Sequence, residues 1–511
     1  MYATACVRQV FACLAFCFFV LLSGKADAQT FTLSGVIFNE SVYLEGEDLQ
    51  ATVDPYLNTP LTFGDVSAMI DDVAQLYVAM GVLTATVVLE PQEVAEGGVL
   101  ALTLVEAVLE DISYQARSDF QEQLLENVFQ EEVGDFPDFD RLAQQVRYFQ
   151  VAYGQVPSIA FEAGQAPQTT RQAVSLEVER RADWSVSLDN HANDGEGRAR
   201  LTLARNIFDL TGRLDSLAAS VSLSSGGFSI AGTYRRPVAA FGGMMSVAAT
   251  ISQKEVVDGP FAAARLATDT MEFSANYTQP FWVQADRFYQ FQLGATLNRS
   301  NSTILGVPLQ ETSLSYLDAR VSMARSYPRA SLSADLALRF GSASSATLAT
   351  TDGSFVILLA NAAYSRVLSD RFSLLLSGRL QLAPDQNLPS SMRISAGGLG
   401  SLVGYPEDVR TGDSGFTGRI QLSCNAPCIG DPSSRIQNQL FAFIDFGQIE
   451  VFRGPNANLV DNPTLYSAGF GANFQIGNAI ANFTLGVPFT ETTGFRDAGT
   501  PRIYAGVTYR F

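Results

Sequence analysis

The sequence predicts two small α+β modules followed by a 16-stranded antiparallel transmembrane β-barrel. Three observations predict this fold class. The order strand, helix, helix, strand, strand occurs twice between residues 31 and 179. Beyond Arg181, apolar and polar residues alternate with a period of two. About sixteen segments keep that alternation within about 330 residues, a density typical of a barrel whose tilted strands cross a bilayer in roughly 9 to 11 residues.

The composition narrows the class of protein. Of the 511 residues, 47% are hydrophobic, so most of the chain can bury a core and disorder is not its dominant state. A mean hydropathy of +0.11 is too polar for a bundle of membrane helices. The formal charge of −19, from 33 basic and 52 acidic residues, argues against nucleic acid as a partner, because phosphate binding needs a basic face.

The first 28 residues carry an export signal. Arg8 precedes an apolar run from Val10 to Leu22, which is shorter than the roughly 20 residues that a membrane helix needs. Ala26-Asp27-Ala28 supplies the small residues that a signal peptidase prefers. We therefore predict a signal peptide over residues 1–28, with cleavage before Gln29.

Export places the mature chain in an oxidising compartment. Cys424 and Cys428, in the segment CNAPC, are then expected to close a small disulfide loop, with free thiols as the alternative. The chain has one histidine, His191, so the ligands for a metal site are lacking. The segment Gly412–Gly415 lacks the G-x-S-x-G pattern of a nucleophile elbow. We predict no metal, no cofactor and no catalytic residues, hence no enzyme.

The two modules are predicted over residues 29–108 and 109–181. In the first, a helix from Gly64 to Met80 carries an apolar stripe with spacings of three and four residues. The stripe consists of Val66, Met69, Ile70, Val73, Leu76 and Tyr77. The second module repeats the same order of elements, with helices over residues 120–129 and 138–153. Modules that end on strands offer open sheet edges, which can accept an extended peptide by backbone pairing.

The first module is strongly acidic. No Lys or Arg occurs between Ala26 and Ala116, whereas residues 31–110 hold 13 acidic side chains. One interpretation is a solvated acidic surface in an acidic protein. The other is repulsion from anionic membrane and a preference for a neutral or basic peptide partner.

The barrel is predicted over residues 182–511. In its first segment Trp184, Val186 and Leu188 alternate with serines, and later segments repeat this scheme. The segments begin near residues 184, 199, 216, 228, 245, 271, 287, 314, 330, 354, 371, 415, 438, 465, 480 and 502. An even number of strands returns both ends of the barrel to the side where the modules lie. The last segment alternates up to a terminal aromatic residue, Phe511.

These features resemble the two-partner secretion outer-membrane transporters (TpsB type), the haemolysin secretion/activation protein family of the POTRA-plus-β-barrel polypeptide-transport superfamily. The resemblance covers nearly the whole mature chain. In the first module it rests on LYVAMG (76–81) and LTLVEA (102–107). In the barrel, residues 397–416 resemble the family's loop that folds back into the lumen, here at about residues 390–414, and Phe443, Asp445 and Gly447 match its F-x-D-x-G strand motif.

The loop tip departs from the family's pattern. The family has V-R-G-Y, whereas this chain has Leu402-Val403-Gly404-Tyr405, with valine in place of the arginine. In the family that arginine pairs with the aspartate that corresponds to Asp445. As a hypothesis, Arg410 or Arg419 reaches Asp445 instead. The alternative is a divergent transporter whose loop is loosely held.

The resemblance implies a bacterial outer-membrane transporter with POTRA modules in the periplasm. The modules would bind an unfolded secreted exoprotein, which would cross the outer membrane through the barrel lumen, and the wall of the barrel would face outer-membrane lipid. The barrel-assembly machinery would recognise the end of the chain at Phe511. Two alternatives stay open, a factor that assembles and inserts other outer-membrane proteins, and a passive pore.

Overall fold

The computed structural model describes residues 30–511 except 180, 239–241, 259–261, 346–352, 385, 426–427, 429–435, 452–462 and 493–497. The predicted signal peptide, residues 1–28, lies outside the described residues. In the described part of the chain, no helix has the length and apolar character that a membrane span requires. The chain divides into two compact units; residues 109–113, 131–139 and 159–173 of the second module group with the first module, and its other residues group with the barrel.

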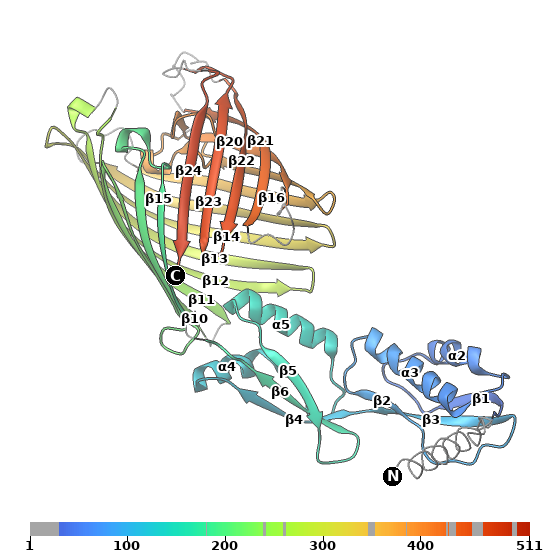
Figure 1. Ribbon diagram of the computed structural model, residues 1–511. Helices are drawn as coiled ribbons and strands as arrows, with labels where there is room; N and C mark the ends of the chain where they lie inside the picture. Colours follow the sequence, from blue (N-terminus) through green and yellow to red (C-terminus); the bar gives the residue numbers. More distant parts are fainter. Residues whose placement is uncertain are drawn as a thin grey trace, which may run out of the picture. The chain divides into compact units, whose positions relative to one another are not determined.

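The first module has the predicted order of elements (Figure 1). These are β1 (Leu33–Phe38), α2 (Gly46–Val53), the 3-10 helix η1 (Asp54–Tyr56), α3 (Phe63–Ala79), β2 (Ala85–Val88) and β3 (Gly98–Glu106). The sheet order is β1-β3-β2, with β1 parallel and β2 antiparallel to the central strand. The predicted stripe of α3 is largely buried in the core, together with Leu33, Leu100 and Leu102.

Helix α3 begins at a capping box, which explains its start. The Thr62 hydroxyl accepts the Asp65 backbone N–H, and the Asp65 carboxylate accepts the Thr62 N–H at 2.7 Å. The backbone N–H and the hydroxyl of Thr62 donate to Asp65 and lower the pKa of its carboxyl group.

The second module repeats this architecture. It contains β4 (Val108–Gln115), α4 (Asp119–Val128), α5 (Phe139–Tyr153), β5 (Ser158–Ala163) and β6 (Thr169–Ser175). The sheet order β4-β6-β5 is that of the first module, with the last strand in the centre. The predicted repeat of two α+β modules is therefore confirmed.

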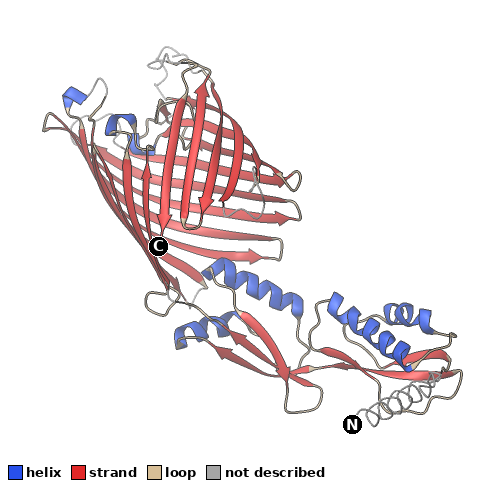
Figure 2. Ribbon diagram, viewed as in Figure 1, coloured by secondary structure: helices blue, strands red, loops and turns tan. Residues whose placement is uncertain are grey.

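The remainder of the chain forms a closed barrel of sixteen antiparallel strands, as predicted, in which β24 pairs with β7 (Figures 1 and 2). The strands are β7 (Arg181–Asp189), β8 (Arg200–Phe208), β9 (Ser216–Ser224), β10 (Gly227–Val238), β11 (Gly243–Glu255), β12 (Ala267–Val283), β13 (Arg287–Ile304), β14 (Val307–Tyr327), β15 (Ala330–Ser345), β16 (Gly353–Val367), β17 (Phe372–Leu382), β20 (Ser414–Cys424), β21 (Ile436–Glu450), β22 (Leu465–Ile476), β23 (Ala479–Pro488) and β24 (Arg502–Arg510).

The two faces of the barrel wall differ in polarity. On β13 the side chains of Leu293 and Leu297 are 55% and 60% exposed on the outer face. On the lumenal face of the same strand, Gln292 donates to Asn276 and Asn298 donates to Glu272. This separation of lipid-facing and water-facing residues is what the alternation predicts.

One predicted strand start was clearly wrong. Strand β14 begins at Val307, seven residues before the predicted position near 314. It continues an 18-residue strand, β13, through a turn in which Leu305 and Gly306 have positive φ. A hairpin of this length extends beyond the bilayer, where neither lipid nor lumen imposes alternation, so the pattern fades before the strand ends.

Candidate functional site

The loop between β17 and β20 folds back against the inner wall of the barrel. It contains the 3-10 helix η4 (Ser390–Met392) and a short hairpin of β18 (Ile394–Ala396) and β19 (Arg410–Gly412). At its tip Leu402, Val403 and Tyr405 are fully buried. Leu402 and Tyr405 share a cluster with wall residues of β21 and β22, and Val403 shares one with wall residues of β21 and β24. The loop tip is therefore seated on β21 to β24.

Asp445 on β21 is the centre of polar contacts under the tip. Its buried carboxylate accepts the backbone N–H of Val403 at 2.9 Å. Arg419 donates from Nε to Oδ1 at 2.6 Å and from Nη2 to Oδ2 at 3.0 Å. Arg419 and Asp445 are direct cross-strand partners, so the guanidinium reaches the carboxylate as a two-pronged fork.

The two candidate arginines therefore lie in different places. Arg419 contacts Asp445 and also lies over the Phe443 ring, 4.6 Å from its centroid. Arg410, on β19, donates to the Thr492 hydroxyl at 2.8 Å. Val403, which stands where the family has arginine, donates only its backbone N–H to Asp445. The ion pair thus lies within the wall, and the loop adds a hydrogen bond to it.

Tyr405 anchors the tip through both its hydroxyl and its carbonyl. The hydroxyl accepts the Thr490 N–H at 3.1 Å, and it lies 3.0 Å from the carbonyl oxygens of Tyr466 and Thr490, to either of which it can donate. The Tyr504 hydroxyl donates to the Tyr405 carbonyl at 3.3 Å. These bonds join the tip to the segments that contain β22 and β24 and to the end of β23.

Glycine residues make room for the tip. Gly404 has φ +114, a conformation that favours glycine. On the wall, a Cβ at Gly486 would lie 2.6 Å from the carbonyl carbon and oxygen of Val403. A Cβ at Gly447 would lie 3.1 Å from the Leu402 side chain. Sequence reasoning missed Gly486, because a glycine at a lumenal strand position carries no signal of its own.

The base of the loop is fixed by Asp413. Its Oδ1 accepts the Leu388 N–H at 2.7 Å and lies 3.4 Å from Nε of Arg393. Gln381 donates to the carbonyls of Met392 and Asp413, at 2.9 and 3.1 Å. The aspartate of the segment Gly412–Gly415 thus holds the loop to the end of β17.

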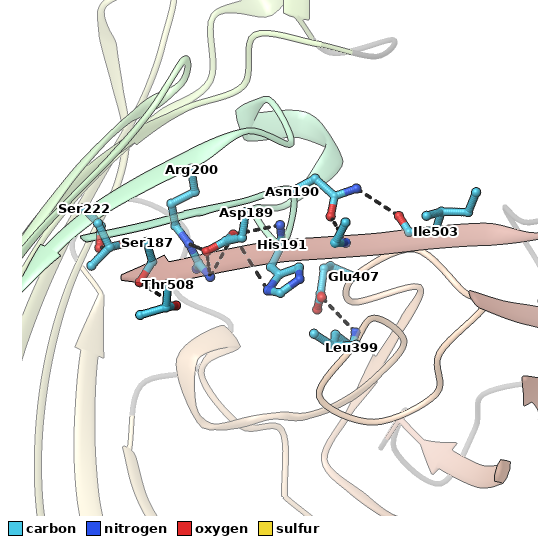
Figure 3. Close-up of polar contacts among 12 residues, drawn as sticks. Ser187, Asp189, Asn190, His191, Arg200, Ser222, Leu399, Glu407, Ile503 and Thr508 are labelled. Carbon is cyan, nitrogen blue, oxygen red and sulfur yellow. Dashed lines mark hydrogen bonds and ion pairs between the residues drawn. The ribbon is translucent and has the colours of Figure 1, made fainter. Parts of the chain in front are cut away.

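The barrel closes beside this loop, at the hairpin that follows β7 (Figure 3). Asn190 donates to the Ile503 carbonyl at 2.9 Å and accepts the Ala505 N–H at 2.7 Å, so its side chain extends the pairing of β7 with β24. Asp189 accepts the His191 N–H at 2.9 Å and pairs with Arg200. A cavity of about 800 Å³ lies between this hairpin and the loop segment that contains Glu407.

The remaining predicted residues lie away from the tip. Cys424 and Cys428 form a disulfide at the end of β20. The backbone of Phe511 pairs with Trp184 through hydrogen bonds of 2.9 and 3.0 Å, and its side chain is 60% exposed. Over the ranges that the structure describes, no three His, Cys, Asp or Glu side chains are grouped in a way that could hold a metal ion.

Comparison with known proteins decides the family. Residues 170–474 match the model of the haemolysin secretion/activation protein ShlB/FhaC/HecB. The chain belongs to this family. Residues 31–107 match the ShlB-type POTRA domain. This family member is therefore an outer-membrane transporter of the POTRA-plus-barrel superfamily, with its POTRA modules in the periplasm. A search of curated protein sequences finds no match.

Solved structures with the same fold span nearly the whole transporter. CdiB from Escherichia coli has a TM-score of 0.65 at 18% identity, over 96% of this chain and 92% of that one. CdiB from Acinetobacter baumannii has a TM-score of 0.63 at 15% identity, over 100% and 98%. BamA from Haemophilus ducreyi lacking POTRA domains 1–3 has a TM-score of 0.60 at 14% identity, over 94% and 100%.

Proposed function

We propose that this transporter moves an unfolded exoprotein across the outer membrane by two-partner secretion. The periplasmic modules bind the exoprotein, which then passes through the barrel lumen. The observation that carries the proposal is the seated loop, which occupies the lumen beside β21 to β24 and is held there by non-covalent contacts. Such a plug can be displaced and reseated, as a conduit that opens for a passing chain requires.

The lumenal wall suits a polypeptide in transit. Arg339 pairs with Asp318 at 3.0 Å, and Arg320 pairs with Asp335 at 2.9 Å. Because these charges are balanced across neighbouring strands, an extended chain meets polar groups without strong electrostatic trapping. The proposed transport uses no cofactor and no catalytic residue, and folding outside the cell would bias the movement outward.

Two alternatives are less well supported. The likeness to BamA extends to the fold, but the family model that covers the barrel is the secretion/activation model. A passive pore would gain nothing from two modules with an open sheet edge. We also propose that outer-membrane lipid surrounds the wall and that the barrel-assembly machinery recognises Phe511.

Deletion of residues 31–180 separates these functions. The deleted form and the full chain would be expressed in outer membranes together with an exoprotein encoded beside the transporter gene. We expect secretion of this one exoprotein to be lost while ion conductance of the barrel survives. If secretion continues, or if the levels of many unrelated barrel proteins fall, the secretion proposal is wrong.

A further inference from the structure

The first module has one open sheet edge. Strand β1 is partly covered on its outer side, because Asn58 donates to the Leu33 carbonyl at 2.8 Å and Phe31 pairs with Leu61. Strand β2 pairs with β3 on one side. On its other side, no described residue forms a backbone hydrogen bond with Ala85–Val88. Unpaired backbone groups of this kind accept an extended peptide as an added strand.

Apolar side chains surround this edge and are exposed to solvent. Leu83, two residues before the start of β2, is 71% exposed, and Val88, at the end of β2, is 38% exposed. Helix α3 lies against β2, and its last turn and C-cap present Val78 and Met80, both more than half exposed. Val78, Met80 and Leu83 are thus exposed apolar side chains at the start of the edge, of the kind that marks an interaction site. Val88 follows Val87, which is buried in the core beneath α3, so Val88 lies on the opposite face of the sheet.

The charges next to the edge are all negative. Gln92 donates to the Ala101 carbonyl at 2.7 Å and accepts the Ala101 N–H at 2.9 Å, which pins the segment after β2 onto β3. This contact holds the exposed Glu90 and Glu93 at the end of the open edge. The nearest cations along the sequence are Lys25 and Arg117. The carboxylates therefore have no basic side chain of their own module to pair with.

We propose that this edge selects exoprotein segments in which apolar residues alternate with Lys or Arg. The apolar side chains of the bound strand contact Val78, Met80 and Leu83, and its cations lie beside Glu90 and Glu93. Charge complementarity favours a basic segment as the occupant of this edge. The acidic module repels an acidic peptide or an anionic lipid surface. The inference rests on the proposed secretion function and adds the class of segment that is recognised.

Binding of synthetic peptides to the full mature chain in detergent tests the inference. Three nine-residue peptides share the same alternating valines and carry Lys, Ser or Glu between them. We expect the Lys peptide to bind more tightly than the Ser peptide, and the Glu peptide to bind most weakly. Two exposed carboxylates change such binding by about fivefold at low salt, and the difference shrinks above about 0.5 M salt.

Paired variants locate the effect. The double variant Glu90→Gln with Glu93→Gln should weaken the binding of the Lys peptide by about fivefold and leave the affinity for the Ser peptide unchanged. The control, Glu40→Gln with Glu45→Gln, removes the same charge from exposed positions after β1 and before α2 and should have little effect. A photo-crosslinking Lys peptide should label residues 78–93.

Two results would overturn the inference. One is equal affinity for the three peptides, and the other is an equal loss in both double variants. Secretion by the unmodified transporter is measured in parallel. Secretion without charge preference refutes this inference alone, whereas charge preference without secretion refutes the proposed function.

Discussion

Replacement of Arg419 tests whether the ion pair under the loop tip stabilises the barrel. Arg419→Met keeps the apolar stem over the Phe443 ring and removes the guanidinium. Asp445 then keeps the Val403 N–H and a 3.5 Å contact with the Ser467 hydroxyl, and loses its bonds of 2.6 and 3.0 Å. Removing one partner of a buried pair costs roughly 3–5 kcal/mol.

A lower value is expected here because lumenal water can enter the space that the guanidinium leaves. The side chain of Arg419 is 20% exposed, whereas that of Asp445 is fully buried. We therefore expect the free energy of unfolding to fall by about 2–3 kcal/mol in Arg419→Met and by about 1–2 kcal/mol in Asp445→Asn. In the double variant, the loss of unfolding free energy should be about 2 kcal/mol smaller than the sum of the losses in the two single variants.

Guanidinium unfolding in detergent, followed by the loss of the folded band on unheated gels, measures these changes. The matched control is Arg379→Met on β17, a lumenal arginine whose side chain has no hydrogen-bond partner among the described residues; it should change stability by less than about 0.5 kcal/mol. The reasoning fails if Arg419→Met resembles this control, or if the two single variants are additive.

Three further predictions concern the tip and the first module. Gly486→Ala places a carbon 2.6 Å from the backbone of the tip, so bilayer recordings should show a larger mean conductance, whereas Gly378→Ala, whose Cβ would meet only a carbonyl oxygen at 3.6 Å, should not. Tyr405→Phe leaves the half-buried Thr490 N–H without its acceptor and should lower the free energy of unfolding by about 1 kcal/mol; an unchanged midpoint would exclude this anchor. The lowered pKa of Asp65 stabilises the folded module above the ordinary value of 3.8, and this contribution is lost as pH falls through the folded-state pKa. The urea midpoint of the helical circular dichroism signal should therefore depend less on pH, between pH 5 and 3, in Asp65→Asn than in the unmodified chain.

The sequence predicted the barrel well because lipid and lumen constrain every second residue of each strand. All sixteen segments from Trp184 onward correspond to strands, and the error at Val307 arose where a hairpin leaves the membrane. The long helix of the first module was also predictable, because its apolar stripe faces the core; the capping box at Thr62, which the sequence analysis did not identify, fixes where this helix begins.

The contacts of the loop tip could be predicted only in part. The sequence offered Arg410 and Arg419 as partners for Asp445, and both were plausible by residue type. The choice between them depends on the register of β20 against β21, which places Arg419 opposite Asp445. The place of Gly486 beneath Val403 depends on how a loop packs on a strand about 80 residues later, and no local pattern encodes such a contact.

The position of the ion pair has a consequence for how the lumen opens. Both charges belong to the wall, so a withdrawing tip leaves them together and separates no ion pair. The contacts that break at the tip are hydrogen bonds and van der Waals contacts, whose energy vanishes within an ångström or two of displacement. The contacts of the tip therefore resist small displacements of the loop. They are lost together once an arriving chain moves the tip by more than this distance.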